Sequence, residues 1–106
     1  MNNEVIKPLS QQNFSEEIAQ GTIIVDFWAS WCGPCRSMLK IIDDLAGSDK
    51  LQAGVTIGKV DIDANPDLAA QFNVMTIPTL IVFKDGKEIK RFVGVQSADT
   101  LISATQ

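Results

Sequence analysis

The chain has 106 residues, of which 45% are apolar and 21% are charged, and its formal net charge is −4. This length suits a single domain over residues 1–106, which buries about 60–70% of its unfolded surface and needs no disulfide framework to fold. The negative charge argues against nucleic-acid binding, and the short apolar runs argue against a membrane span. The chain has no histidine, which excludes Ser-His-Asp catalysis and His-ligated metals, and two cysteines remain as the main reactive groups.

The N-terminal region predicts a short edge strand followed by a short helix. Residues 4–9 fit the strand, and residues 1–10 show no basic and apolar leader, so we expect no signal peptide. Asn13 is placed to cap the helix, with Glu16 three residues later as its capping-box partner. Two apolar residues then fall on one face of that helix.

A buried strand and a long helix follow. Residues 22–29 (TIIVDFWA) are almost wholly apolar and rich in β-branched and aromatic side chains, as in a strand covered on both faces. Apolar residues then recur at steps of three and four over residues 35–46, with charged residues on the other side, which predicts an amphipathic helix. Pro34 suits the first turn of this helix, and Gly47 suits its C-terminal end.

The second half of the chain again alternates strands and helices. Residues 65–67 (NPD) combine a capping residue, a proline and an acid, which predicts a helix start. Asp85-Gly86 is typical of a two-residue hairpin turn, and Ser97 is placed to cap a final short helix. Three further strands are predicted, at residues 54–62, 79–83 and 88–93.

The order of these elements predicts an α/β fold. Strands that alternate with helices imply parallel strand pairs with helices on both faces of the sheet. The hairpin near the end of the chain adds an antiparallel pair. We therefore expect a mixed central sheet of about five strands, flanked on both faces by about four helices.

One motif carries most of the chemical information. Residues 31–35 (WCGPC) lie where the buried strand ends and the helix begins, and two thiols at this spacing can close a small disulfide ring. The unpaired N–H groups and the dipole of a helix N-terminus favour a thiolate at Cys32, whereas Cys35 lies on the apolar face of the helix. We therefore expect Cys32 to attack and Cys35 to resolve. Gly33 permits the tight approach, and Pro34 begins the helix without losing a donor.

Two alternatives to a redox role remain open at this motif. A structural disulfide is one, although a ring this small closes little chain entropy and stabilises little. A structural zinc site needs four ligands, and two cysteines without histidine do not supply them from one chain unless carboxylates take part. Two chains could share a zinc ion if each contributed Cys32 and Cys35.

A charged residue in the buried strand is the second unusual feature. Asp26 stands alone among apolar residues, and a buried carboxylate without a partner either costs several kcal/mol or takes up a proton. Lys59 lies in the middle of another strand, and the two groups approach each other beneath the cysteines if these strands are neighbours. One interpretation makes Asp26 a proton acceptor for Cys35, tuned by Lys59. The other places Asp26 at a watery rim and extends Lys59 into solvent.

A proline at the entrance to a buried strand is the third feature. Residues 76–79 (TIPT) place Pro78 where a strand would lose a backbone donor. This is either an ordinary boundary between loop and strand or a cis peptide bond, which occurs in only about 5–6% of X–Pro bonds in folded proteins. A cis bond would present the backbone of Thr76 and Ile77 to an extended peptide.

Together these residues resemble the thioredoxin family over nearly the whole chain. A Cys-x-x-Cys motif alone is a weak signal. The Trp-Cys-Gly-Pro-Cys motif after a strand, with Asp26 six residues before Cys32 and a later Ile-Pro-Thr, is a specific one. The resemblance implies the thioredoxin fold, in agreement with the pattern of strands and helices. The matching segments are residues 25–29, 31–35, Lys59, 61–63, 77–79 and Gly94.

The resemblance also implies a role for each matching position. Cys32 would be the nucleophile and Cys35 the resolving thiol. Asp26 would be the buried proton-transfer group with Lys59 near it, and Trp28 would pack under the site. The residues that would contact partner proteins around the disulfide are Trp31, Gly33, Pro34, Ile77, Gly94 and Pro78, the last of these in the cis form.

The function implied by this resemblance is that of a general protein thiol-disulfide oxidoreductase, a cytoplasmic monomer. It would reduce disulfides in target proteins through the Cys32–Cys35 couple, would be reduced again by a thioredoxin reductase, and would need no bound cofactor or metal. Two other classes remain open: an oxidase or isomerase with the same fold and a more oxidising couple, and a non-catalytic binding subunit. Met75 and Thr76 precede Ile77, where many family members have a glycine. This difference alters the edge of the surface that would contact partner proteins.

Overall fold

Five strands form the central sheet of the computed structural model, which describes residues 6–106. They are β1 (Ile6–Pro8), β2 (Thr22–Trp28), β3 (Val55–Asp61), β4 (Thr79–Lys84) and β5 (Lys87–Val93). Their order across the sheet is β1-β3-β2-β4-β5. The pairs that involve β3 are parallel, whereas β4 is antiparallel to both β2 and β5. The predicted α/β class and mixed sheet are confirmed.

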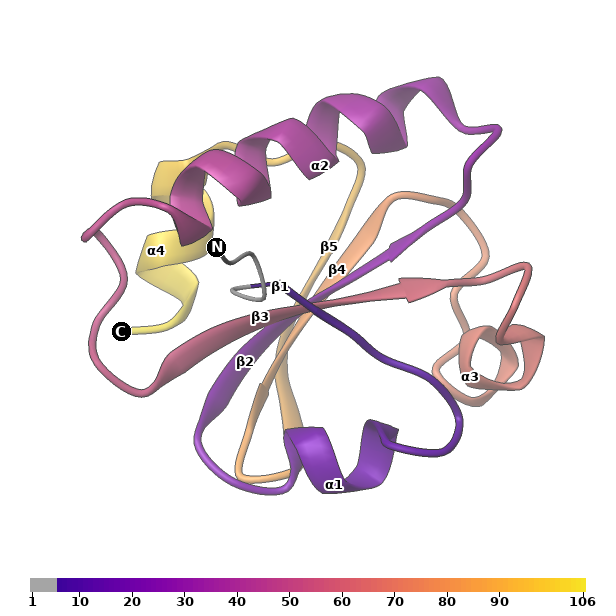
Figure 1. Cartoon of the computed structure of the whole chain (residues 1–106), viewed down its shortest axis with the longest axis horizontal. Helices are drawn as coiled ribbons and strands as arrows, with labels where there is room; N and C mark the ends of the chain where they lie inside the picture. The colour runs from indigo at the N-terminus through magenta and orange to yellow at the C-terminus, as the bar shows by residue number, and fades with distance from the viewer. Residues whose placement is uncertain (1–5) are drawn as a thin grey trace.

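The helices cover both faces of this sheet, as predicted. They are α1 (Phe14–Ile18), α2 (Gly33–Ala46), α3 (Pro66–Gln71) and α4 (Ala98–Ala104). Figure 1 shows α2 and α4 on one side of the sheet and α1 and α3 on the other. Each side has its own apolar cluster, with Met38 and Leu101 in one and Phe14 and Leu68 in the other. None of the helices within the described range is long and apolar enough to cross a membrane.

β2 lies in the middle of the sheet and is covered on both faces, which explains its apolar sequence. Ile24 belongs to the cluster under α2 and α4, and Val25 belongs to the cluster under α1 and α3, because successive strand residues point to opposite faces. Both side chains are fully buried. The end of β2 delivers the chain to the start of α2 at the carboxyl edge of the parallel strands, where α/β sheets commonly place their reactive groups.

Within the described residues, the first strand covers residues 6–8 of the predicted range 4–9. β1 has three residues, and residues 4–5 of the predicted strand lie outside the part of the chain that the structure describes. The same holds for residues 1–5 of the segment in which no signal peptide was expected. Beyond β1, the N–H of Leu9 still donates to the carbonyl of Lys59 at 2.8 Å, so the contact with β3 continues for one more residue.

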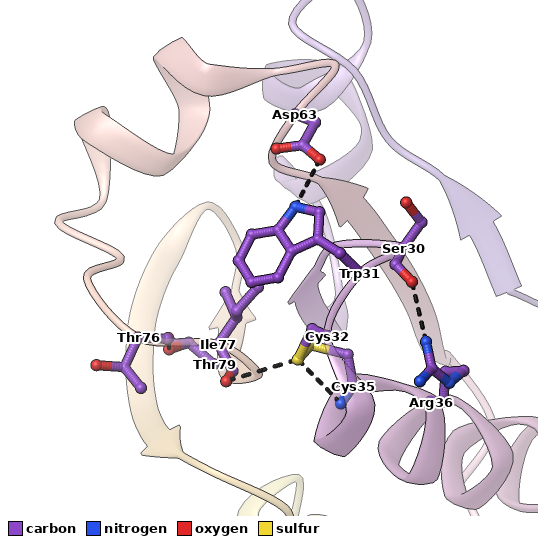
Figure 2. The surroundings of a disulfide bond; sticks show 9 residues. All are labelled: Ser30, Trp31, Cys32, Cys35, Arg36, Asp63, Thr76, Ile77 and Thr79. Carbon is purple, nitrogen blue, oxygen red and sulfur yellow. Dashed lines mark hydrogen bonds between the residues drawn. A yellow bond between two sulfur atoms is a disulfide. The ribbon is translucent and has the colours of Figure 1, made fainter.

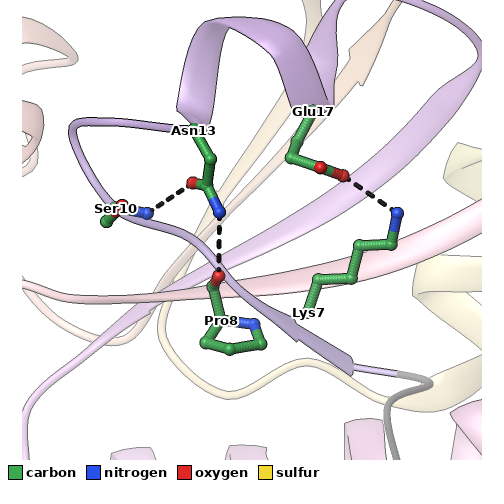
Figure 3. Close-up of polar contacts among 5 residues, drawn as sticks. All are labelled: Lys7, Pro8, Ser10, Asn13 and Glu17. Carbon is green, nitrogen blue, oxygen red and sulfur yellow. Dashed lines mark hydrogen bonds and ion pairs between the residues drawn. The ribbon is translucent and has the colours of Figure 1, made fainter.

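The capping box predicted at Asn13 is wrong. The Asn13 side chain turns back to the loop after β1, where its Oδ1 accepts from the Ser10 N–H at 2.7 Å and its Nδ2 donates to the Pro8 carbonyl at 3.3 Å (Figure 3). The side chain therefore makes no cap hydrogen bond to α1. An ion pair of 2.9 Å between Lys7 and Glu17 joins α1 to β1 in the same region (Figure 3).

Asn65 precedes α3 as predicted, but its side chain does not cap the helix. Its Oδ1 accepts from the Gln11 N–H at 3.1 Å, and its Nδ2 donates to the Asp61 carbonyl at 3.1 Å. The side chain therefore links the loop after β1 to the end of β3. Pro66 begins α3, as expected for a residue that has no N–H to donate.

The hairpin and the last helix follow their local sequence signals. Asp85 and Gly86 have φ angles of 51° and 86°, the positive values that a two-residue turn between antiparallel strands requires. Ser97 Oγ accepts from the Thr100 N–H at 3.1 Å and thereby caps α4. Both predictions are confirmed, because each depends on residues that are close together in the chain.

Candidate active site

The two cysteines form a disulfide at the N-terminus of α2. Cys32 is the N-cap residue with an extended backbone, Cys35 lies in the first turn, and their Cα atoms are 5.2 Å apart. The Cys35 N–H donates to Cys32 Sγ at 3.1 Å (Figure 2). Pro34 also lies in the first turn, where a missing N–H costs nothing. The Cys32 sulfur thus occupies the position of a helix cap, where backbone N–H groups favour negative charge.

The two sulfur atoms differ in their surroundings. Cys35 is fully buried, whereas 5% of Cys32 is exposed. Cys32 Sγ lies 3.9 Å from the carbonyl oxygen of Ile77, in the segment before β4 (Figure 2). A molecule that approaches from solvent therefore reaches Cys32 before it reaches Cys35.

The segment before β4 and the end of β5 complete the surroundings of Cys32. The Ile77–Pro78 peptide bond is cis, the form that the family resemblance implied. The Gly94 N–H donates to the Pro78 carbonyl at 2.8 Å. Gly94 has a φ of 94°, which L side chains rarely adopt, so its conformation favours glycine. Ile77 therefore lies beside Cys32, and Pro78 and Gly94 are connected to Ile77. All three residues are distant from Cys32 in the sequence.

Asp26 is fully buried in β2, and neither of its carboxylate oxygens has a hydrogen-bond partner among residues 6–106. Burial raises the pKa of its carboxyl group from 3.8 to about 7, although the positive charge of Lys59 acts in the opposite direction. The interpretation that placed Asp26 at a watery rim is therefore wrong. Near neutral pH such a group is partly protonated and partly ionised, so it can accept and return a proton.

Lys59 is the register partner of Asp26 across the parallel β2–β3 pair. Its ammonium group lies 5.7 Å from the centre of the Trp28 ring, and the ion pairs within the described residues do not join it to Asp26. Lys59 therefore acts on Asp26 through its charge rather than through direct contact. Trp28 in turn packs against the apolar cluster that contains both cysteines. The expected position of Trp28 under the site agrees with this packing.

Trp31 is 66% exposed beside the disulfide. Its indole Nε1 donates to Asp63 Oδ2 at 2.9 Å, and Arg36 Nη1 donates to the Ser30 carbonyl at 3.0 Å (Figure 2). The sequence had not singled out Asp63 or Arg36 as individual site residues. Asp63 could have been predicted near the site from its position just after β3. The carboxyl ends of neighbouring parallel strands meet at one edge of the sheet, and the cysteine motif follows β2 at that edge.

These features define a class of protein. A disulfide at a helix N-terminus, with one sulfur nearer the solvent and the other buried, is the arrangement expected of a reversible dithiol–disulfide centre. A cross-link over so short a loop would add little stability, which argues against a purely structural role. Within residues 6–106, no group of three or more His, Cys, Asp or Glu side chains is arranged to hold a metal ion. The site is therefore that of a thiol-disulfide oxidoreductase.

Comparisons with known proteins identify the family. The family model for thioredoxin matches residues 5–106. The thioredoxin of Chlamydia trachomatis is 47% identical over 98 residues, which cover 92% of this chain and 93% of the relative. The thioredoxin of Staphylococcus haemolyticus is 46% identical over 96 residues, which cover 91% and 90% of the two chains. The chain therefore belongs to the thioredoxin family.

Solved structures share its fold. The thioredoxin of Malassezia sympodialis has a TM-score of 0.84 and 26% identity, and the match covers 95% of this chain and 91% of that one. A mutant thioredoxin from Halobacterium salinarum has a TM-score of 0.83 and 29% identity, with coverage of 100% and 96%. The predicted thioredoxin fold is confirmed, and the chain is a protein-disulfide reductase with a redox-active pair at Cys32 and Cys35.

Proposed function

We propose that this chain is a general reductant of protein disulfides in the cytoplasm, in which Cys32 is the nucleophile and Cys35 is the resolving thiol. The observation that carries this division of roles is the hydrogen bond of 3.1 Å from the Cys35 N–H to Cys32 Sγ. A backbone donor at a helix N-terminus stabilises the thiolate, which is the nucleophilic form of cysteine. The greater exposure of Cys32 supports the same assignment.

The reaction transfers two electrons from this chain to its target. The Cys32 thiolate attacks one sulfur of a target disulfide, a bond between Cys32 and the target forms, and the first target thiolate leaves. Cys35 then loses its proton and attacks Cys32 Sγ, which releases the second target thiolate. Protonation of the two thiolates completes the target dithiol, and the chain is left with the Cys32–Cys35 disulfide.

Asp26 is our proposed acceptor for the proton of Cys35. Its carboxyl pKa of about 7 suits proton transfer near neutral pH. The protein supplies neither of its oxygens with a hydrogen bond within residues 6–106, so both lone-pair sets remain available to a proton donor. Lys59 favours the ionised form and limits the rise of the pKa that burial causes.

The surface around Cys32 suits an extended segment of a target protein. The exposed residues of this surface offer apolar and backbone contacts beside Cys32 Sγ, the sulfur that attacks the target. Of the residues assigned to substrate binding by family resemblance, Trp31, Gly33 and Pro34 are exposed, Ile77 and Gly94 are half-buried, and Pro78 is buried.

An electron donor must restore the dithiol after each turnover. We assign this step to a thioredoxin reductase, and we expect the chain to act as a monomer without a bound cofactor. It would then carry electrons from that reductase to disulfide-containing target proteins. These assignments rest on membership of the thioredoxin family.

The reduction potential of the Cys32–Cys35 couple tests the direction of electron flow. The protein is equilibrated with dithiol/disulfide buffers while the fluorescence of Trp28 and Trp31 is followed. A value near about −270 mV, as is known for thioredoxins, would support a reductase. A value between about −180 and −120 mV would support an oxidase or isomerase instead.

The division of roles is tested by replacing Cys35. In Cys35→Ser the target stays bound to Cys32, so mixed disulfides with target proteins should accumulate and be visible by mass spectrometry. Cys32→Ser is the matched control and should form no mixed disulfide. Turnover by Cys35→Ser at the full rate would contradict the assigned roles. A double variant without either cysteine that kept all biological function would favour a binding subunit.

A further inference from the structure

The exposed indole of Trp31 is oriented by one hydrogen bond. Trp31 is 66% exposed, so burial contributes little to fixing its side chain. Its Nε1 donates to Asp63 Oδ2 at 2.9 Å, and Figure 2 shows the indole N–H directed at that carboxylate. The bond joins residues 32 positions apart, from the loops that follow two different strands. Because Trp31 immediately precedes Cys32, this bond determines how the ring lies at the edge of the reactive site.

Asp63 is itself fixed to the sheet. Its backbone N–H donates at 2.9 Å to Oδ1 of Asp61, the last residue of β3. The intervening residue, Ile62, donates its N–H to the Trp28 carbonyl at 3.0 Å, which ties the end of β3 to the end of β2. The backbone of Asp63 is thus held in place relative to the strand that leads into the cysteine motif, and its carboxylate extends from this fixed point to the indole.

We propose that Asp63 is a positioning residue for target binding, because its hydrogen bond presets the Trp31 indole as one wall of the docking surface. The proposal rests on the proposed function, in which Trp31 contacts the target protein. A side chain that already has its bound orientation loses less conformational entropy when the target docks. Asp63 acts through Trp31, so its effect falls on the binding of large targets rather than on the exchange of disulfides.

Single-turnover oxidation of the Asp63→Ala variant tests this role. Pre-reduced protein is mixed with insulin at increasing concentrations, and alkylation of quenched samples gives the rate at which the Cys32–Cys35 disulfide forms. We expect the half-saturating insulin concentration to rise about two- to tenfold, the factor that corresponds to ordering one side chain on binding. The maximal rate should stay near that of wild type. The rate with hydroxyethyl disulfide, which is too small to use the wall, should change much less.

Two variants serve as controls for this measurement. Asp63→Asn keeps an oxygen that can accept from the indole but removes the charge, so it should bind insulin nearly as well as wild type. Asp67→Ala removes a carboxylate and its hydrogen bond from Gln11, which is 3.2 Å long, in the neighbouring helix α3. It should leave the half-saturating concentration unchanged. By NMR, the Trp31 indole N–H signal should shift and exchange faster only in Asp63→Ala.

A double-mutant cycle separates positioning from a general effect on folding. Trp31→Phe removes the indole N–H and keeps an aromatic ring, so it breaks the same bond from the other side and tests the proposal even if Asp63→Ala folds poorly. In the Trp31→Phe background, Asp63→Ala should have no further effect on the half-saturating concentration. An unchanged half-saturating concentration in Asp63→Ala would overturn the proposal, as would an additive cycle or an equal fall of the rates with both disulfides. A wild-type protein that reduced hydroxyethyl disulfide but not insulin would overturn the proposed function itself.

Discussion

The N-termini of helices α2 and α4 have the same local geometry. At α2 the Cys35 N–H donates to Cys32 Sγ, and at α4 the Thr100 N–H donates to Ser97 Oγ. Both bonds span three residues and are 3.1 Å long. Both cap residues have an extended backbone. Each is therefore an ordinary helix N-cap in its backbone and its hydrogen bond.

The two caps differ in the capping atom and in what surrounds it. Ser97 is exposed, and its hydroxyl also donates to Thr100 Oγ1 at 3.0 Å. Cys32 is almost wholly buried, with its sulfur near the Ile77 carbonyl. A hydroxyl stays neutral at physiological pH, whereas a thiol at a helix N-terminus gains stability by becoming an anion. A helix cap therefore becomes a redox centre when it carries sulfur and the tertiary structure builds a docking surface beside it.

Cys32→Ser should have the largest effect, because it converts the α2 cap into the type found at α4. A serine hydroxyl caps a helix well, so the free energy of unfolding should stay within about 1 kcal/mol of that of the reduced wild type. Insulin reduction should be abolished, because the attacking sulfur is gone. Urea unfolding and an insulin assay check the two expectations. A Cys32→Ser protein that reduced insulin at the wild-type rate would show that Cys32 is not the nucleophile.

Asp26→Asn should have the next largest effect. Cys32 Sγ at the α2 cap accepts a backbone hydrogen bond, whereas the buried Asp26 carboxylate has no hydrogen-bond donor within residues 6–106. Its pKa is raised to about 7, so the free energy of unfolding of the wild type falls as the pH rises from about 4 to about 7. The variant escapes this loss and should be more stable at pH 8 by about 4 kcal/mol, at about 1.4 kcal/mol for each pKa unit.

The pH dependence provides the control for Asp26→Asn. At pH 3.5 the Asp26 carboxyl group is protonated in the folded chain and mostly protonated in the unfolded chain, so the gain in stability should fall below about 0.5 kcal/mol. Urea unfolding of the oxidised proteins at the two pH values measures both numbers. Asp43→Asn, on the exposed side of α2, should show no comparable gain. An equal gain at both pH values would show that ionisation of Asp26 is not its cause.

Ser97→Ala should have the smallest effect and should touch stability alone. It removes the hydrogen bond to the Thr100 N–H, which should lower the free energy of unfolding by about 1 kcal/mol. The reduction potential of the Cys32–Cys35 couple should not change, because the residue that caps α4 takes no part in the redox site. Ser97→Asp, which keeps an accepting oxygen, should restore the stability. A change in the potential of the disulfide would indicate that the two caps are coupled.

Local patterns predicted those parts of the fold whose partners lie nearby in the chain. The turn at Asp85-Gly86 and the start of α2 at Gly33 and Pro34 depend on neighbouring residues, and both agree with the structure. The cap predicted at Asn65 failed because its side chain bonds to Gln11, 54 positions earlier. Helix-cap patterns specify which residue can accept a hydrogen bond, but a partner brought close by folding can compete for that residue.

The candidate site likewise has some features that the sequence predicts and others that only the folded structure shows. The cysteine motif at the junction of a strand and a helix, and one acid in a buried strand, are properties of the amino-acid order and were readable from it. Only folding brought the Ile77 carbonyl to Cys32, 45 positions away, and Asp63 to Trp31, 32 positions away. These contacts depend on which strands pair and which loops meet at the edge of the sheet. The local preferences of individual residues do not specify such pairings, because pairing is decided by how the two apolar faces of the sheet are buried.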